Sequence, residues 1–255
     1  MEYFTTTSNA SRRAVDCVIV GVYARNKLGV GAEEVNTASK GEISKRIKSG
    51  DICSSIGRCT ILTNVPGVKA DRVAVVGLGK SGKLTATGFK KSLTAAAQAI
   101  SQTKAKSALT CLTLEPVVDS SSYYLARHTA EAVHDVLYRF TQMKSGRKKK
   151  GSPLRTIGIA VAKRSDAAKA KLGAEHGEGI AAGVSLAKEL GNLPANVCTP
   201  EYLARTAKKL AAGNGKLTTK VLNETEMKRL GMGSLLSVSA GSAEPAKLIV
   251  MQYKG

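Results

Sequence analysis

The sequence of 255 residues lacks several features that would place it in a specialised class. It contains no Trp, and aromatic residues make up only 4% of it, which suits helices packed closely on a sheet through Ala and Gly. No apolar run approaches the roughly 18 residues that a membrane-spanning helix needs, so no membrane partner is expected. The N-terminal residues 1–5 lack the basic and then apolar pattern of a secretion signal, and we therefore expect a cytoplasmic protein.

Potential metal ligands and catalytic groups are also sparse. The five cysteines are scattered, without a C-x-x-C pair, at Cys17, Cys53, Cys59, Cys111 and Cys198. The three histidines, His128, His134 and His176, form no H-E-x-x-H motif. This spacing argues against a disulfide scaffold, a zinc site or a Ser-His-Asp triad. No paired carboxylates lie near a Gly-rich loop, so we predict no catalytic residue and no metal ligand within these 255 residues.

Positive charge is the most prominent feature that is present. The formal net charge is +20, and residues 1–165 hold 27 Lys and Arg against 11 Asp and Glu. Residues 166–255 hold 12 against 8, so the excess belongs to the first part. A domain this basic attracts polyanions at low salt. A bias of composition that favours solubility would give the same charge, and both interpretations stay open.

Apolar strand patterns alternate with helical patterns through the first part of the chain. The expected strands are 15–22, 59–63, 72–77, 107–112 and 156–161, and the expected helices are 33–49, 84–103 and 120–143. This alternation predicts an α/β fold with a mostly parallel sheet that is covered on both faces. We assign residues 1–165 to this N-terminal domain.

A linker helix and the beginning of a second α/β domain are expected after it. The linker covers residues 166–191, and its helix, from Asp166 to Leu190, contains four glycines, which suggests close packing of its backbone or a kink. Residues 192–255 begin the second domain, with a helix from Thr199 to Ala212, a strand at 218–222 and two short helices. Residues 247–253 predict a buried strand, and no later element covers it.

Two segments suggest phosphate contacts. The run Arg147, Lys148, Lys149 and Lys150 lies in a Gly- and Pro-bounded loop at 144–153, which is either a solvated loop or a nucleic-acid contact. Residues 77–82 read G-L-G-K-S-G directly after a strand. Leu84 stands where a P-loop needs Ser or Thr, and no acid follows at the distance that a dinucleotide site needs. We therefore favour a tight strand-to-helix turn, with a weak phosphate site as the alternative.

Three motifs carry a resemblance to a known family. They read NLPANVCTPEYLA at 192–204, LGMGSLLSVSAGSAEP at 230–245 and LIVMQYKG at 248–255. In this order and at this spacing they resemble the leucyl (cytosol) aminopeptidase family of two-metal peptidases. The resemblance is strong from about Ser165 to Gly255 and looser before it.

The resemblance implies a macro-like N-terminal domain, a linker helix and a zinc-peptidase-like α/β catalytic domain. It also implies a homo-hexamer that removes N-terminal residues, often Leu, from peptide substrates. In such enzymes two divalent ions, Mn or Zn, polarise the scissile carbonyl and lower the pKa of a bridging water.

The family's metal-binding motifs, Gly-Lys-Gly-x-Thr-Phe-Asp-Ser-Gly-Gly and Asn-Thr-Asp-Ala-Glu-Gly-Arg, match no position of this sequence. We therefore expect the N-terminal half of such an enzyme, with a truncated start of the catalytic domain, no bound metal and no activity alone. The alternative is a DNA-binding or regulatory module that acts through the basic first domain. A weaker hypothesis, based on the macro-like fold, is an ADP-ribose-like ligand at the turn 77–82.

Overall fold

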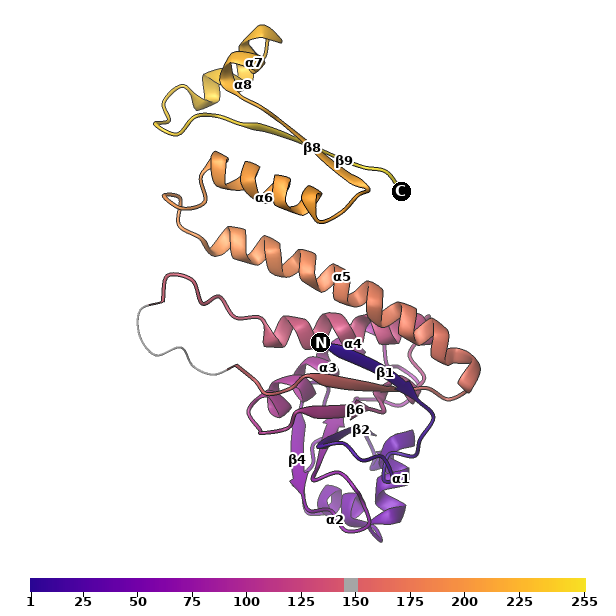
Figure 1. The fold of residues 1–255 in the computed structure, drawn as a ribbon. Helices are drawn as coiled ribbons and strands as arrows, with labels where there is room; N and C mark the ends of the chain where they lie inside the picture. The colour runs from indigo at the N-terminus through magenta and orange to yellow at the C-terminus, as the bar shows by residue number, and fades with distance from the viewer. Residues whose placement is uncertain (145–150) are drawn as a thin grey trace. The chain divides into compact units, whose positions relative to one another are not determined.

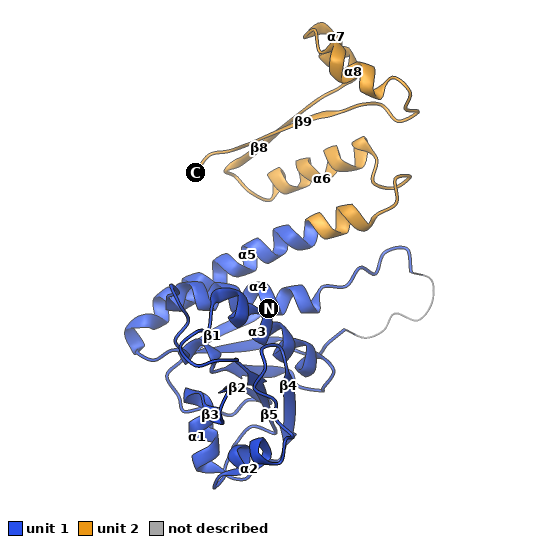
Figure 2. Cartoon of the chain, turned by 180° about the vertical axis from the view of Figure 1, so that it is seen from behind, with its two compact units in different colours: residues 1–186 blue, residues 187–255 orange. Residues whose placement is uncertain are grey.

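The computed structural model describes residues 1–144 and 151–255, which form two compact units (Figures 1 and 2). The first unit is Met1–Leu186 and the second is Ala187–Gly255. The strands of the first unit are β1 (Glu2–Thr6), β2 (Cys17–Tyr23), β3 (Lys27–Leu28), β4 (Cys59–Thr63), β5 (Arg72–Gly77), β6 (Ser107–Thr110) and β7 (Thr156–Ala160). Its helices are α1 (Val30–Ala38), α2 (Glu42–Lys48), α3 (Ala86–Ser101), α4 (Ser122–Leu137) and most of α5 (Ala167–Asn192).

The first unit is built on one mixed sheet with strand order β1-β7-β6-β2-β5-β4, and β3 pairs with β2. Strands β1, β7, β6, β2 and β5 run parallel, whereas β4 is antiparallel to β5. All seven residues of β2 are buried. The expectation of an α/β fold with a mostly parallel sheet is therefore confirmed.

Both faces of the sheet are covered by helices, as its apolar strands require. Along β2, Cys17 and Ile19 face a core that includes residues of α3, α4 and α5. The alternate residues Val18, Val20 and Val22 face a second core that includes residues of α1 and α2. Figure 1 shows these two helical layers on opposite sides of the sheet. The period of two in the strand thus separates two cores.

Several expected boundaries are wrong. Strand β1 was not expected, because its residues have no strong apolar pattern. It forms through parallel pairing with β7. The helix expected at 33–49 is two helices, because Lys40 and Gly41 take positive φ values of 55° and 94° between them. Helix α4 ends at Leu137, earlier than residue 143, since Tyr138 has an extended ψ of 133°.

The second unit contains the end of α5, then α6 (Pro200–Ala212), β8 (Leu217–Leu222), α7 (Glu224–Arg229), α8 (Gly233–Ser239) and β9 (Leu248–Tyr253). Strands β8 and β9 form a two-stranded antiparallel sheet. The strand expected to be buried at 247–253 is largely exposed instead: Val250 is 38% and Tyr253 64% exposed. Among the described helices, none combines the length and the apolar character that crossing a membrane requires.

Two of the glycines in α5 allow a close approach of α4. A Cβ at Gly177 would lie 2.5 Å from the carbonyl oxygen of Arg127, and a Cβ at Gly173 would overlap the carbonyl oxygen of Tyr123. By contrast, a Cβ at Gly179 or Gly183 would have no atom within 4 Å. The expected close packing is therefore confirmed for one pair of glycines only.

This difference gives a matched pair of variants. Gly177→Ala should destabilise the first unit by about 1–3 kcal/mol, because the new methyl group forces α5 away from the backbone of α4. Gly179→Ala should stabilise it by up to about 1 kcal/mol, because it removes only the helix-propensity penalty of glycine. Urea unfolding, followed through the transition of the first unit, measures both changes. Equal midpoints for the two variants would contradict the packing described.

Candidate functional site at the carboxyl edge of the first sheet

The parallel strands of the first unit end along one edge of the sheet. In open α/β sheets, ligands bind outside the carboxyl ends of the strands, where the order of connection reverses. The chain leaves β2, joins β5 on one side, and crosses through α3 to β6 on the other side. The segments that follow β1, β2, β5, β6 and β7 are therefore the places to search for a site.

The glycine turn after β5 has mainly an internal role. The amides of Gly77, Leu78 and Gly79 donate to backbone carbonyl oxygens at 2.8–2.9 Å. Gly79 and Gly82 have φ values of 73° and 74°, a region that favours glycine. The expected tight turn between a strand and a helix is present. These three amides are engaged within the protein, so they are not free to bind a phosphate.

A buried carboxylate, Glu115, lies at the same edge, after β6. It is 4% exposed, accepts a hydrogen bond from the amide of Val30 at 2.7 Å and accepts another from the hydroxyl of Tyr23 at 3.0 Å. Val30 is the first residue of α1, where the helix dipole favours a negative charge. A Cβ at the preceding residue, Gly29, would overlap the Glu115 carboxylate. The protein's own carboxyl group therefore occupies the start of α1.

Burial raises the pKa of Glu115, although the hydrogen bonds from Tyr23 and Val30 act in the opposite direction. The sequence analysis did not identify this residue. The sequence did contain a signal for it, because Glu115 is the first acidic residue after Asp71 and follows an apolar strand.

The three histidines lie in separate groups. His128 contacts Glu131 at 3.2 Å, His134 contacts Glu178 at 3.6 Å, and His176 contacts the hydroxyl of Tyr123 at 2.7 Å. Over residues 1–144 and 151–255, no group of three or more His, Cys, Asp and Glu side chains could hold a metal ion. The described side chains thus do not fit a metal centre.

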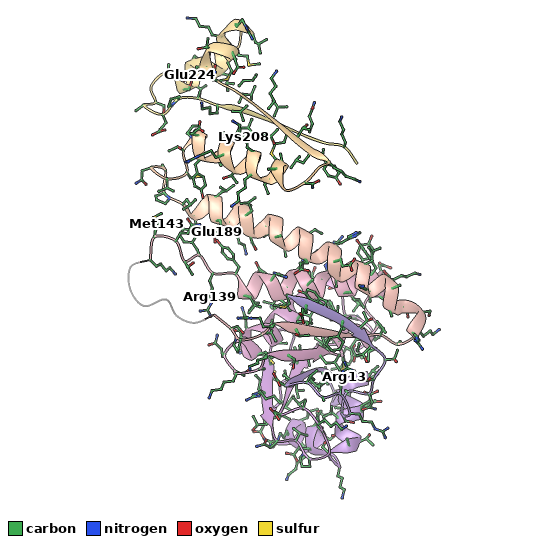
Figure 3. The ribbon with its side chains drawn as sticks, in the orientation of Figure 1. Arg13, Arg139, Met143, Glu189, Lys208 and Glu224 are labelled. Carbon is green, nitrogen blue, oxygen red and sulfur yellow. The ribbon has the colours of Figure 1, made fainter. Side chains whose placement is uncertain are left out.

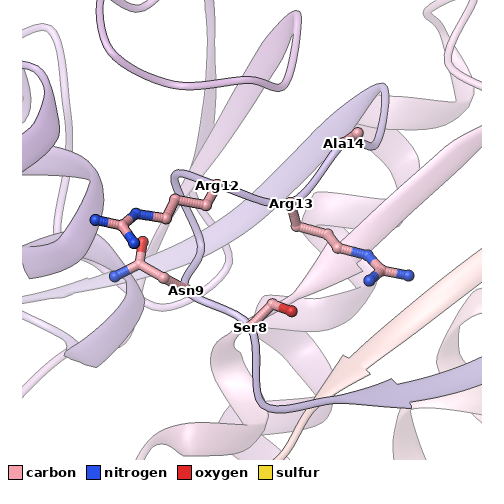
Figure 4. A pocket seen from close by; sticks show the side chains of 5 residues that line it. All are labelled: Ser8, Asn9, Arg12, Arg13 and Ala14. Atoms are coloured by element: carbon pink, nitrogen blue, oxygen red, sulfur yellow. The ribbon is translucent and has the colours of Figure 1, made fainter.

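The loop after β1 forms an open hollow of about 570 Å³. Its lining residues are Ser8, Asn9, Arg12, Arg13 and Ala14 (Figure 4). Figure 4 shows the guanidinium groups of Arg12 and Arg13 pointing to opposite sides of the loop. The guanidinium carbon of Arg13 lies 4.8 Å from the centre of the Phe4 ring, which holds this side chain in place. The hollow presents basic and polar groups and was not predicted from the sequence.

The proposed nucleic-acid contact at Arg147, Lys148, Lys149 and Lys150 lies outside the described residues. The residues around it can be placed. Arg155 directly precedes β7, so it lies at the amino edge of the sheet.

The first sequence motif of the second unit organises the start of α6. The Thr199 hydroxyl caps the helix by accepting from the Tyr202 amide at 3.3 Å, and Pro200 is the first helical residue. Glu201, in the first turn, pairs with Lys247 at 3.2 Å, just before β9. The motif thus places an ion pair between the first turn of α6 and the residue before β9.

Comparison with known protein families now decides the identity of the fold. Residues 19–147 match the cytosol aminopeptidase family, N-terminal domain, and residues 185–255 match the catalytic domain of the same family. The chain belongs to the cytosol aminopeptidase family.

Curated relatives that bear the family's name match all or nearly all of this chain. A probable cytosol aminopeptidase of Nitrosococcus oceani is 37% identical over 255 residues, which is 100% of this chain and 51% of the relative. One from Paraburkholderia xenovorans is 40% identical over 240 residues, or 94% of this chain and 47% of the relative. The chain thus spans about half the length of these relatives.

Two solved structures share the fold of this chain. A K354E mutant of tomato leucine aminopeptidase aligns with all of this chain and 51% of its own, with a TM-score of 0.83 and 23% identity. The bottromycin maturation enzyme BotP in complex with Mn aligns with 94% of this chain and 46% of its own, with a TM-score of 0.72 and 25% identity.

The buried Glu115 gives a pH-dependent prediction. Its raised pKa means that the folded state binds this proton more tightly than the unfolded state, so its contribution to stability falls as pH rises through the folded-state pKa. Glu115→Gln keeps an acceptor for Val30 and removes the charge. It should therefore gain stability relative to the unmodified protein as pH rises from acid to neutral.

Glu115→Ala is the matched control. It leaves the Val30 amide and the Tyr23 hydroxyl without this acceptor at every pH, and it should lose about 1–3 kcal/mol. Thermal unfolding of the three proteins at several pH values measures both effects. A Gln variant that loses stability relative to the unmodified protein as pH rises would contradict the assignment.

Proposed function

We propose that these 255 residues are the N-terminal domain and the beginning of the catalytic domain of a metal-dependent leucyl aminopeptidase. The observation that carries the proposal is the pair of family matches, to the N-terminal domain at 19–147 and to the catalytic domain at 185–255. The structural match to tomato leucine aminopeptidase supports the fold over the whole chain. In the full-length enzyme, the proposed substrates are peptides, the assembly is a homo-hexamer and the location is the cytoplasm.

Two divalent ions, Mn or Zn, would supply an activated water and a polarised carbonyl in that enzyme. The similar enzyme BotP has been solved in complex with Mn, which supports a metal in this family. The side chains described here do not fit such a centre, and the family's metal-binding motifs match no position of the sequence. We therefore assign no catalytic residue and no metal ligand to this chain. Its proposed role is to supply the fold that precedes the catalytic centre.

The 255-residue chain alone should show no aminopeptidase activity. The reason is the missing set of metal ligands, without which the activated water cannot form. Hydrolysis of a leucine chromogenic amide with added Mn²⁺ measures it, and a full-length relative such as the Nitrosococcus oceani protein serves as the positive control. Turnover by the purified chain, at the same rate after a second purification step, would contradict the proposal.

The positive charge of the chain favours a second proposed function, the binding of DNA. The net charge of +20 is concentrated in residues 1–165, and this excess attracts the phosphate backbone of nucleic acids. DNA is the proposed partner, and its recognition would depend on phosphates more than on base sequence.

Duplex DNA should bind the chain with an affinity that falls steeply as salt rises and depends little on sequence. Changing Arg147, Lys148, Lys149 and Lys150 together to Gln should weaken binding and reduce the salt dependence, since each lost phosphate contact lowers the slope by about 0.9. Mobility shifts at several salt concentrations measure this. An unchanged shift in the variant would exclude this loop as a contact, and no shift at low salt would exclude the function.

A further inference from the structure

The hollow after β1 brings together hydrogen-bond donors without an acid in its lining. The side-chain oxygen of Asn9 accepts from the amide and the hydroxyl of Ser11, at 2.9 and 2.7 Å, so its remaining polar group is the donating NH₂. The Ser8 hydroxyl accepts from the Thr6 hydroxyl at 2.9 Å and keeps its own proton to donate. Both polar side chains thus complement a negatively charged ligand.

The two arginines are available for an external partner. Within residues 1–144 and 151–255, the guanidinium groups of Arg12 and Arg13 make no ion pair with an acid at 4.0 Å or less. Arg12 is exposed, and Arg13 is held over Phe4 by a cation–π contact. Guanidinium groups that are oriented but unpaired match phosphate oxygens well.

Further positive charge follows the neighbouring strand. Thr6, the last residue of β1, pairs in parallel register with Ala160, the last residue of β7. The segments after both strands therefore leave the same edge, and the second one carries the exposed residues Lys163 and Arg164.

Acidic groups limit the surface on one side. A neighbouring hollow shares Asn9 and Arg12 and includes Glu33 and Glu34 of α1. The Glu34 carboxylate is engaged, because it accepts from the Ala10 amide at 2.6 Å. An anionic ligand would thus be directed from Arg12 toward Arg13 and away from α1.

We infer that Arg12 and Arg13, with Ser8 and Asn9, form a contact surface for the phosphate backbone of a nucleic acid. The two guanidinium groups point apart, so they do not converge on one phosphate, and they suit a ligand with repeated negative charges (Figure 4). Double-stranded DNA carries one charge per about 1.7 Å of its axis, which provides that repetition. The inference rests on the proposed DNA binding and adds a described surface to it.

Arg147, Lys148, Lys149 and Lys150 lie outside the described residues, so this surface does not include them. Of the described residues beside them, Arg155 lies directly before β7, whereas Arg12 and Arg13 lie between β1 and β2. In Figure 3, Arg13 lies on the opposite side of the first unit from Arg139 and Met143, which precede the loop. The two contacts can therefore be tested independently.

The test is the binding of a labelled short DNA duplex to the full chain at several salt concentrations, followed by fluorescence anisotropy. Arg12→Gln with Arg13→Gln should weaken binding about 5–10-fold and lower the salt slope by about 1–2. The charge-matched control, Arg46→Gln with Lys48→Gln on α2, removes a guanidinium that is already paired with Glu42 at 2.8 Å and should change binding less. Arg12→Lys with Arg13→Lys should restore most of the salt slope, because the charges return. Unchanged thermal unfolding would show that the variants fold.

The outcomes are distinguishable. If the unmodified chain does not bind DNA at low salt, the proposed DNA binding fails and this surface fails with it. If it binds, and the Arg12 and Arg13 variant matches the control, the surface is wrong while DNA binding stands. If polyglutamate competes as well as DNA at equal charge, the partner is an acidic polypeptide and the assignment to nucleic acid is overturned.

Discussion

Burial of strand β2 on both faces and both edges is the constraint on which the first unit depends. Its seven residues, from Cys17 to Tyr23, are all buried, with β5 and β6 paired on either side. Such a strand can exist only inside a sheet that is covered by helices on both faces. The helices α1 and α2 supply one cover, and α3, α4 and α5 supply the other. The same arrangement places every loop that could bind a ligand at the ends of the strands.

The sequence predicted most of this arrangement because apolar strand runs are strong local signals. It failed where pairing in three dimensions decides the structure. Strand β1 is stabilised by its register with β7, which lies about 150 residues away and leaves no local apolar pattern. The break between α1 and α2 depends on positive φ values at Lys40 and Gly41, and only the second has an obvious sequence signal.

The candidate site was predicted only in part. The glycine turn after β5 forms the expected turn between a strand and a helix, and three of its amides donate to backbone carbonyl oxygens. Glu115 was missed because its partners Tyr23 and Val30 are distant in sequence, and the Arg12 and Arg13 hollow was missed because it depends on the conformation of one loop. A lone Glu after a strand, or two arginines in a polar loop, are common patterns, and only their surroundings distinguish them.

The basic residues and the family matches describe two different properties of one chain. The matches assign its fold to the cytosol aminopeptidase family over about half the length of its relatives. We propose that the positive charge of the first unit, with Arg12 and Arg13 beside one hollow, suits a polyanion. A role as a polyanion-binding domain requires no metal, and the histidines and acids described here serve local contacts instead.

The central proposal is that the chain carries the family's fold but, in residues 1–144 and 151–255, not its metal-binding centre. Calorimetric titration of the purified chain with Mn²⁺ tests this claim most directly, with a full-length family member as the reference. The account predicts no stoichiometric binding to the chain, because no group of ligands of the required kind occurs in its described parts. Saturable binding of two Mn²⁺ ions per chain would contradict it.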